Sequence, residues 1–283
     1  MTESRYLTVD GLRLHYLEAG TGRMTLVLLP GLTANAHSFD GLLAAGLSRR
    51  LHVLAFDARG RGLSDKPDGG YGIADHARDV VGSLDALDLE RVVLAGHSFG
   101  GLLTYYVAAH HRERVEKAVV LDAPVELDPA ILDQIAPSLA RLERTYAAWD
   151  DYDAHVRSLP YWDRSAWSDE IDAYYRGDAE QLPDGTVRAR CRPEHIQAVI
   201  QGEFDVDWQT TLAAVSCPTL VVRATQPFGP PGSGPILGAE SARRVVATLR
   251  DARLVEIDGN HLTFLFGTPA QRVVDAIESF AGV

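Results

Sequence analysis

The sequence predicts an α/β fold in which helices flank a mostly parallel central sheet. Short apolar runs recur along the 283-residue chain, and their near-continuous apolar character is typical of strands covered on both faces. The intervals between these runs repeat their apolar residues at helical spacing. Strands that alternate with helices indicate βαβ units, and such units build parallel sheets.

A hairpin opens the predicted sheet and gives it an antiparallel edge. Two strand-like stretches, residues 7–9 and 12–16, flank Asp10 and Gly11, and an Asp-Gly pair at this place is typical of a two-residue hairpin turn. Helical periods are clearest in the segments 73–87, 102–107 and 273–280. The remaining predicted strands cover residues 26–29, 53–56, 92–95, 118–121, 219–222 and 254–257.

The interval from residue 124 to residue 208 breaks this rhythm, because it contains no strand-like run. All four tryptophans of the chain lie in it, together with several tyrosines. We interpret residues 124–208 as a helical cap over the carboxyl edge of the sheet, and residues 1–123 and 209–283 as the core domain. Some of the aromatic side chains are expected to form the core of the cap and others to line the substrate site. The residues predicted to bind substrate are Trp162, Tyr161 and Trp149.

Composition restricts the possible partners. With a formal net charge of -12, the chain repels nucleic-acid phosphates and anionic membrane surfaces, so we expect neither as a partner. The two cysteines, Cys191 and Cys217, are too few for a disulfide framework or a cysteine-rich zinc site. The sequence shows no signal-peptide pattern and no apolar run of roughly 20 residues, which predicts a cytoplasmic protein. It does not indicate an oligomeric state.

Residues 96–101 read GHSFGG and contain the G-x-S-x-G pattern of a nucleophile elbow, placed between a predicted strand and a predicted helix. Ser98 is then expected on a tight turn with its hydroxyl exposed, and Gly96 and Gly100 let the neighbouring backbone approach. The helix that begins here directs its first amides toward developing negative charge. We predict that Ser98 is the nucleophile of a serine hydrolase.

With this motif in its strand–turn–helix setting, the chain resembles the α/β-hydrolase fold superfamily over nearly its whole length. Residues 28–32, which read LLPGL, resemble the oxyanion loop of the family, with Pro30 where histidine is more common. This departure is tolerable because a backbone amide does the work. The resemblance implies that the amides of Leu32 and Phe99 form the oxyanion hole.

The same resemblance assigns the histidines and the turn after the fourth predicted strand. His261 follows the last predicted strand, where the family places its catalytic histidine, and it comes after the serine in the chain, as the fold requires. We therefore predict that His261 is the general base. His97, inside the elbow, is expected to pack or to shape the pocket. In the turn at residues 56–64 we interpret Asp57 and Arg59 as structural.

The acid is where the sequence departs from the family pattern. The usual place, just after the strand 219–222, holds Gln226, and a neutral amide does not stabilise an imidazolium as a carboxylate does. Some members of the family carry the acid at the end of the preceding strand, which here ends at Asp122. We predict that Asp122 is the acid; the alternative is that it only ties down a loop. Other carboxylates are less suited by position: Glu126, Asp128, Glu240 and Asp258.

The predicted reaction is the hydrolysis of a small, hydrophobic carboxylic ester or lactone through an acyl-enzyme. The sequence contains no metal-binding motif and no dinucleotide fingerprint, so no metal and no cofactor are expected. Two alternatives stay open: carbon–carbon bond hydrolysis of a diketone, which some relatives perform with similar residues, and a small-ligand receptor that retains the triad. Epoxide hydrolases and haloalkane dehalogenases are disfavoured, because they place aspartate at the elbow.

Overall fold

The computed structural model of the protein describes residues 2–126, 129–162 and 167–283. Within these ranges the main sheet has eight strands in the order β1-β2-β4-β3-β5-β6-β10-β11. From β4 to β11 the neighbouring strands run parallel, which confirms the predicted fold class. The strands are β1 (Glu3–Val9), β2 (Leu12–Ala19), β3 (Thr25–Leu29), β4 (His52–Phe56), β5 (Val92–His97), β6 (Val115–Leu121), β10 (Thr219–Ala224) and β11 (Ala252–Ile257).

The hairpin at the edge of the sheet forms as predicted. Strands β1 and β2 pair antiparallel, with Val9 opposite Leu12 next to the turn. The two turn residues, Asp10 and Gly11, have φ angles of 48° and 82°, and two positive φ angles are what a tight hairpin turn of this type requires. Strand β2 pairs antiparallel with β4 and so joins the hairpin to the parallel strands.

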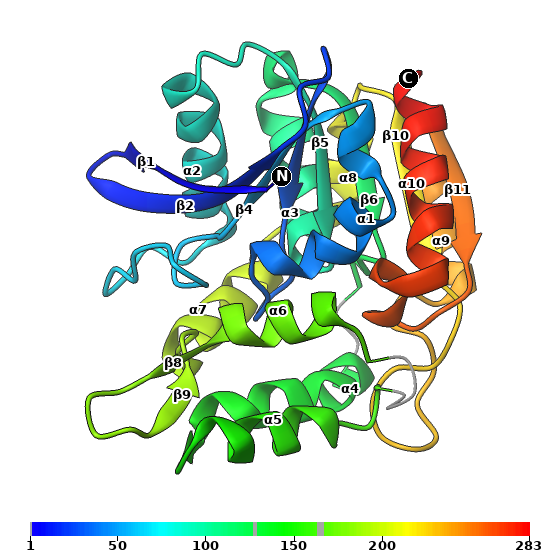
Figure 1. Ribbon diagram of the computed structural model, residues 1–283. Helices are drawn as coiled ribbons and strands as arrows, with labels where there is room; N and C mark the ends of the chain where they lie inside the picture. Colours follow the sequence, from blue (N-terminus) through cyan, green and yellow to red (C-terminus); the bar gives the residue numbers. More distant parts are fainter. Residues whose placement is uncertain (1, 127–128, 163–166) are drawn as a thin grey trace.

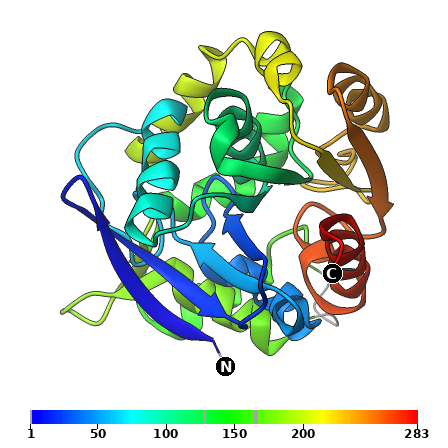
Figure 2. The same ribbon diagram turned by 90° about the horizontal axis from the view of Figure 1, so that it is seen from above.

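Helices cover both faces of the sheet (Figure 2). Along β3, Leu26 and Leu28 pack in the apolar cluster with α1 and α10, whereas Val27 and Leu29 pack in the cluster with α2, α3, α8 and α9. Burial on both faces explains why the strands read as continuous apolar runs. The helices of this part are α1 (Asp40–Ala44), α2 (Ile73–Ala86), α3 (Phe99–His110), α8 (Trp208–Ala214), α9 (Ala239–Thr248) and α10 (Gly267–Ala281), with short 3-10 turns η1 (Ala36–Phe39), η2 (Leu47–Arg49), η3 (Arg112–Arg114) and η6 (Thr263–Leu265).

We call residues 124–208 the insert. Its described residues lie at one end of the main sheet, below it in Figure 1. The expectation of a segment without strands was wrong, because a three-stranded antiparallel sheet of order β7-β9-β8 forms among its described residues. Strands of two or three residues are too short for an alternating pattern to show in the sequence. The elements of the insert are α4 (Pro129–Ala140), η4 (Arg141–Glu143), β7 (Thr145–Tyr146), α5 (Trp149–Arg157), α6 (Asp169–Asp178), β8 (Ala179–Gln181), β9 (Val187–Ala189) and α7 (Pro193–Phe204).

Contacts between the insert and the rest of the chain are extensive. Helix α6 packs against α1 and η1, and α7 packs against α2. The side-chain amide of Asn35 donates to the Tyr174 carbonyl at 3.0 Å, which ties the loop after β3 to α6. Within the described residues, no helix has both the length and the apolar character to cross a membrane.

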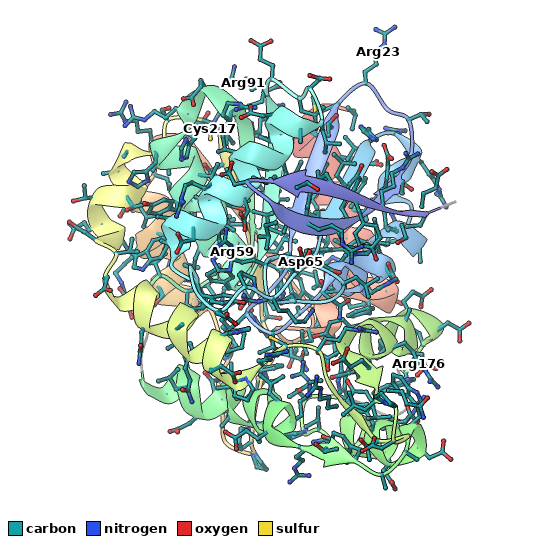
Figure 3. The ribbon with its side chains drawn as sticks, turned by 90° about the vertical axis from the view of Figure 1, so that its left-hand side faces the viewer. Arg23, Arg59, Asp65, Arg91, Arg176 and Cys217 are labelled. Atoms are coloured by element: carbon teal, nitrogen blue, oxygen red, sulfur yellow. The ribbon has the colours of Figure 1, made fainter. Side chains whose placement is uncertain are left out.

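The turn after β4 is held by buried charged groups. The Asp57 carboxylate accepts from the amide of Ala36 and from His15 Nδ1, both at 2.7 Å, and so fixes the segment that follows β3. Burial alone would raise the pKa of Asp57, but the hydrogen bond from His15 lowers it below its ordinary value. Arg59 in the same turn, which Figure 3 labels, pairs with Asp79 of α2. These contacts support the structural reading of Asp57 and Arg59.

Candidate active site

Ser98 lies at the junction of β5 and α3, in the backbone conformation of a strained elbow. Its φ angle is 53° and its ψ angle is -120°, a combination rare for a residue with a side chain. Glycines make the turn possible. A Cβ on Gly96 would lie 1.9 Å from the Gly100 carbonyl oxygen, and one on Gly100 would lie 2.1 Å from the Leu29 carbonyl oxygen. The sequence thus permits the crowded strand–turn–helix that presents the Ser98 hydroxyl.

His261 and Asp122 form a buried pair. His261 Nδ1 donates to Asp122 Oδ2 at 2.7 Å, which leaves Nε2 as the ring nitrogen able to accept a proton. The second carboxylate oxygen of Asp122 accepts from the amide of Ala224, the last residue of β10, at 3.0 Å. Asp122 has no exposed surface, so water does not compete for its two oxygens.

The usual position of the acid and the other described candidate carboxylates lie away from His261. Gln226, in the usual place of the family's acid, is exposed and donates to Asp258 at 2.7 Å. Glu126 and Glu240 both form ion pairs with Arg244 at the surface, and Asp128 lies outside the described residues. Asp122 is therefore the carboxylate that the structure places on His261.

A cavity of about 90 Å³ joins these residues. Ser98 and His261 line it together with Leu32 and Phe99, the two residues whose amides are expected to form the oxyanion hole. Phe99 is the first residue of α3, so its amide has no acceptor within the helix. The Leu32 carbonyl accepts from Arg61 Nε at 2.9 Å, which fixes the loop after β3.

His97 supports the loop that carries His261. Its Nε2 donates to the main-chain carbonyl of His261 at 2.8 Å, and the two rings lie 4.5 Å apart. Burial, and then the charge that His261 can carry, lower the pKa of His97 well below its ordinary value. A neutral His97 adds no positive charge beside the imidazole of His261.

Comparison with known proteins identifies the family of the chain. The sequence model of the alpha/beta hydrolase fold family matches residues 25–268. The chain belongs to the α/β-hydrolase fold family.

Two curated relatives and one solved structure of this family illustrate the similarity. The chain is 29% identical over 187 residues to the 2-(acetamidomethylene)succinate hydrolase of Mesorhizobium japonicum, covering 66% of this chain and 60% of the relative. It is 35% identical over 120 residues to the N-formylmaleamate deformylase of Pseudomonas putida, covering 42% of this chain and 44% of that relative. Both matches thus span less than two thirds of the relative. The crystal structure of E-2-(acetamidomethylene)succinate hydrolase superposes with a TM-score of 0.85 at 24% identity over 100% of both chains, a likeness of fold.

Of the three aromatic residues predicted to bind substrate, the structure of this α/β-hydrolase-fold chain brings Tyr161 to the cavity. The Tyr161 ring stacks on Phe228 with centroids 4.5 Å apart, and its hydroxyl lies 2.9 Å from Ser138 Oγ. Trp162 and Trp149 are not among the residues that line this cavity.

Trp162 and Trp149 instead take part in the packing of the insert. Trp162 Nε1 donates to the Tyr175 hydroxyl at 2.6 Å, and its ring meets Phe266 edge to face. Trp149 is partly buried under the guanidinium of Arg176, which lies on α6 at the surface (Figure 3). These contacts give no support to a role in substrate binding. Large aromatic rings bury much apolar area, and here both rings are used to pack the insert.

Several residues of the cavity had no signal in the sequence. Ile131, Ile135 and Arg141 reach it from the end of the insert that follows β6, and Phe228 reaches it from the loop after β10. The packing of the insert against the main sheet brings Ile131, Ile135 and Arg141 to this cavity. Within the described ranges, no group of three or more His, Cys, Asp or Glu side chains is arranged to hold a metal ion.

Proposed function

We propose that the protein is a serine hydrolase that cleaves a small carboxylic ester or lactone through an acyl-enzyme. Ser98 is the nucleophile, His261 the general base and Asp122 the acid of this proposal. The observation that carries it is the 2.7 Å hydrogen bond from His261 Nδ1 to the buried Asp122, beside a cavity that His261 shares with Ser98.

The proposed reaction has two halves. His261 Nε2 takes the Ser98 proton while Oγ attacks the carbonyl carbon, and Asp122 stabilises the imidazolium that forms. The amides of Leu32 and Phe99 donate to the oxyanion, after which His261 returns the proton to the departing alcohol oxygen. Water then attacks the acyl-serine with the same base, which releases the acid and restores Ser98.

In this proposal the insert, residues 124–208, acts as a cap over a core formed by residues 1–123 and 209–283. The cavity is small, and most of its lining is apolar, which favours a small substrate with a hydrophobic part. Insert residues such as Ile135 and Tyr161 contact one side of the cavity, and the strand ends that carry Ser98 and His261 form the other. The cap thus selects the substrate, and the core performs the chemistry.

Amide hydrolysis is a second candidate, favoured by the names of two relatives. Both 2-(acetamidomethylene)succinate hydrolase and N-formylmaleamate deformylase are named for compounds that contain an amide. The same acyl-serine would form, with nitrogen as the leaving atom. Rates on a p-nitrophenyl ester and on the anilide of the same acid distinguish the two candidates.

The test uses p-nitrophenyl acetate with wild-type protein and Ser98→Ala. Wild-type protein is expected to turn over steadily, with an acetyl group on Ser98 detectable by mass spectrometry after rapid quenching. Ser98→Ala should lose activity by on the order of a million-fold while its melting temperature is kept. Equal rates in the two proteins would contradict the proposal. If wild-type protein stops after a few turnovers, the result would favour a small-ligand receptor. If it hydrolyses a diketone but no ester, the result would favour carbon–carbon bond hydrolysis.

A further inference from the structure

A buried guanidinium lies in the wall of the cavity. Arg141, at the start of η4, is 2% exposed, and it lines the same cavity as Ser98 and His261. The reaction described above does not use it. A buried arginine is costly unless its donors are satisfied, so its hydrogen bonds indicate what it is built to hold.

One edge of the guanidinium is fully used. Nε donates to Asp178 Oδ2 at 2.9 Å and Nη2 donates to Asp178 Oδ1 at 2.6 Å, a bidentate pair. The Tyr152 hydroxyl donates to the same carboxylate at 2.6 Å. A further N–H, on Nη1, donates to the Ser138 carbonyl at 2.6 Å.

The opposite fork, formed by the two terminal nitrogens, is poorly satisfied. In the described part of the chain it meets Thr33, with Oγ1 at 3.4 Å from Nη1 and at 3.5 Å from Nη2, and with the Thr33 carbonyl at 3.3 Å from Nη2. These distances exceed those of a normal N–H···O bond, and they are much longer than those to Asp178. Thr33 lines the cavity beside Arg141, so both partners of these long contacts border space that a ligand can reach.

The surroundings of this fork suit an anion. Burial opposes the charge of Arg141, but the Asp178 carboxylate raises the pKa of Arg141 well above its ordinary value, so the guanidinium stays charged. The hydroxyls of Ser138 and Tyr161, 2.9 Å apart, also line the cavity. Tyr161 is also hydrogen-bonded to the Tyr175 side chain, so when Tyr161 donates to Ser138 the Ser138 hydroxyl hydrogen is left to donate to a ligand.

We propose that the terminal fork of Arg141, with the hydroxyls of Thr33, Ser138 and Tyr161 around it, binds a carboxylate of the substrate. The inference rests on the proposed function and names its substrate class: small acyl compounds that carry a carboxylate away from the scissile bond. A planar carboxylate accepts both N–H groups of such a fork at normal hydrogen-bond distances, a match that the long contacts to the two Thr33 oxygens do not provide.

The test compares two p-nitrophenyl esters of one shape, the monoester of glutaric acid and its glutaramate analogue, in which a neutral amide replaces the free carboxylate. Wild-type protein should favour the glutarate ester in kcat/KM by about 10-fold or more, after subtraction of the spontaneous rate, as a charged bidentate contact supplies. The double variant Arg141→Gln, Asp178→Asn leaves no unpaired buried charge, and its ratio should fall to about one. The matched control is Arg188→Gln with Glu180→Gln, a partly exposed ion pair of the insert in which Glu180 also pairs with Arg190, and it should keep the wild-type ratio.

The outcomes separate this inference from the proposed function. Equal rates on the two esters, or a preference for the amide, would overturn the carboxylate site while leaving the serine hydrolase in place. If wild-type protein hydrolyses neither ester, the proposed function fails instead. Calorimetric titration with glutarate then tests the carboxylate site by itself. Binding to wild-type protein that the double variant loses supports the site. No binding to a millimolar protein sample at 10-fold molar excess of glutarate, roughly 10 mM, overturns it.

Discussion

Asp122 owes its place on His261 to the backbone around it. Its φ angle of 50° turns the chain sharply at the end of β6, and its amide donates to the Val222 carbonyl of β10 at 2.7 Å. The carboxylate is thereby held between β10 and the imidazole. Asp122→Asn is expected to lower kcat by about 10⁴-fold, because the neutral amide neither fixes the tautomer nor stabilises the imidazolium.

Gln226→Ala is the matched control for this prediction. Gln226 occupies the family's usual acid position but is exposed and bonded to Asp258, so its loss should change kcat by less than about threefold. The measurement is kcat on p-nitrophenyl acetate for both variants. A larger loss for Gln226→Ala than for Asp122→Asn would assign the acid's role to the β10 loop instead.

His97 makes stability depend on pH. Because burial lowers its pKa, the folded protein keeps His97 neutral, whereas the unfolded chain protonates it below about pH 6.5. The unfolded state therefore binds more protons as the pH falls, and the free energy of unfolding decreases. His97→Gln keeps a donor for the His261 carbonyl but does not titrate. As the pH falls, its free energy of unfolding should therefore decrease by up to about 1.4 kcal/mol less per pH unit than that of wild type. Urea unfolding of both proteins at pH 7 and pH 5.5 measures the two free energies. An identical decrease between the two pH values in wild type and variant would contradict the prediction.

At the scale of elements, the elbow requires the start of α3 to approach the end of β3 with no side chain between their backbones. In Gly100→Ala the new Cβ would collide with the backbone oxygen of Leu29, so α3 would have to shift away from β3. We expect a loss of about 3 kcal/mol or more in the free energy of unfolding, or no folded protein. Gly69→Ala, whose Cβ meets nothing within 4 Å, should stay within about 0.5 kcal/mol of wild type. Equal melting temperatures for the two variants would show that the elbow relaxes freely.

The elements also show which features of the fold and the site could be predicted from the sequence. The strands of the main sheet were predictable because burial on both faces demands uninterrupted apolar residues, and the hairpin because Asp10 and Gly11 suit its turn. Asp122 was predicted as the partner of His261 because Gln226 holds the usual place of the acid and some members of the family carry it at the end of the strand that here ends at Asp122. The short strands of the insert and the reach of Arg141 into the cavity were not, since both depend on packing between segments far apart in the chain. The same packing placed Trp162 away from the cavity.

At the scale of the whole molecule, we expect the substrate to reach Ser98 between α4 and the loop after β10. A wider surface depression shares Pro124, Ile131 and Ile236 with the cavity. Gln134 of α4 closes this boundary, since its amide donates to the carbonyls of Phe228 at 3.1 Å and of Gly234 at 2.6 Å. The side chain of Gln134 is therefore one of the contacts that join the insert to the core beside the cavity.

Gln134→Ala is expected to loosen this boundary. Rates on p-nitrophenyl esters of two to eight acyl carbons should shift several-fold in favour of the longer chains, with a loss of about 1–2 kcal/mol in stability. Gln181→Ala removes a similar bond, to the Gly185 carbonyl at 3.0 Å, on the exposed side of the insert, and should leave the chain-length profile unchanged. An unchanged profile in Gln134→Ala would place the path of the substrate elsewhere.

The insert departs from the chain between two strands that are neighbours in the sheet. Val119 of β6 lies beside Leu220 of β10, and α8 alone completes the crossover between these parallel strands. The insert is therefore looped out of a single βαβ unit that closes without it. In evolutionary terms, such a segment can be lengthened, shortened or exchanged while the residues around Ser98 keep their positions. Mutations within residues 124–208 can then change which molecules are admitted without altering the residues that react.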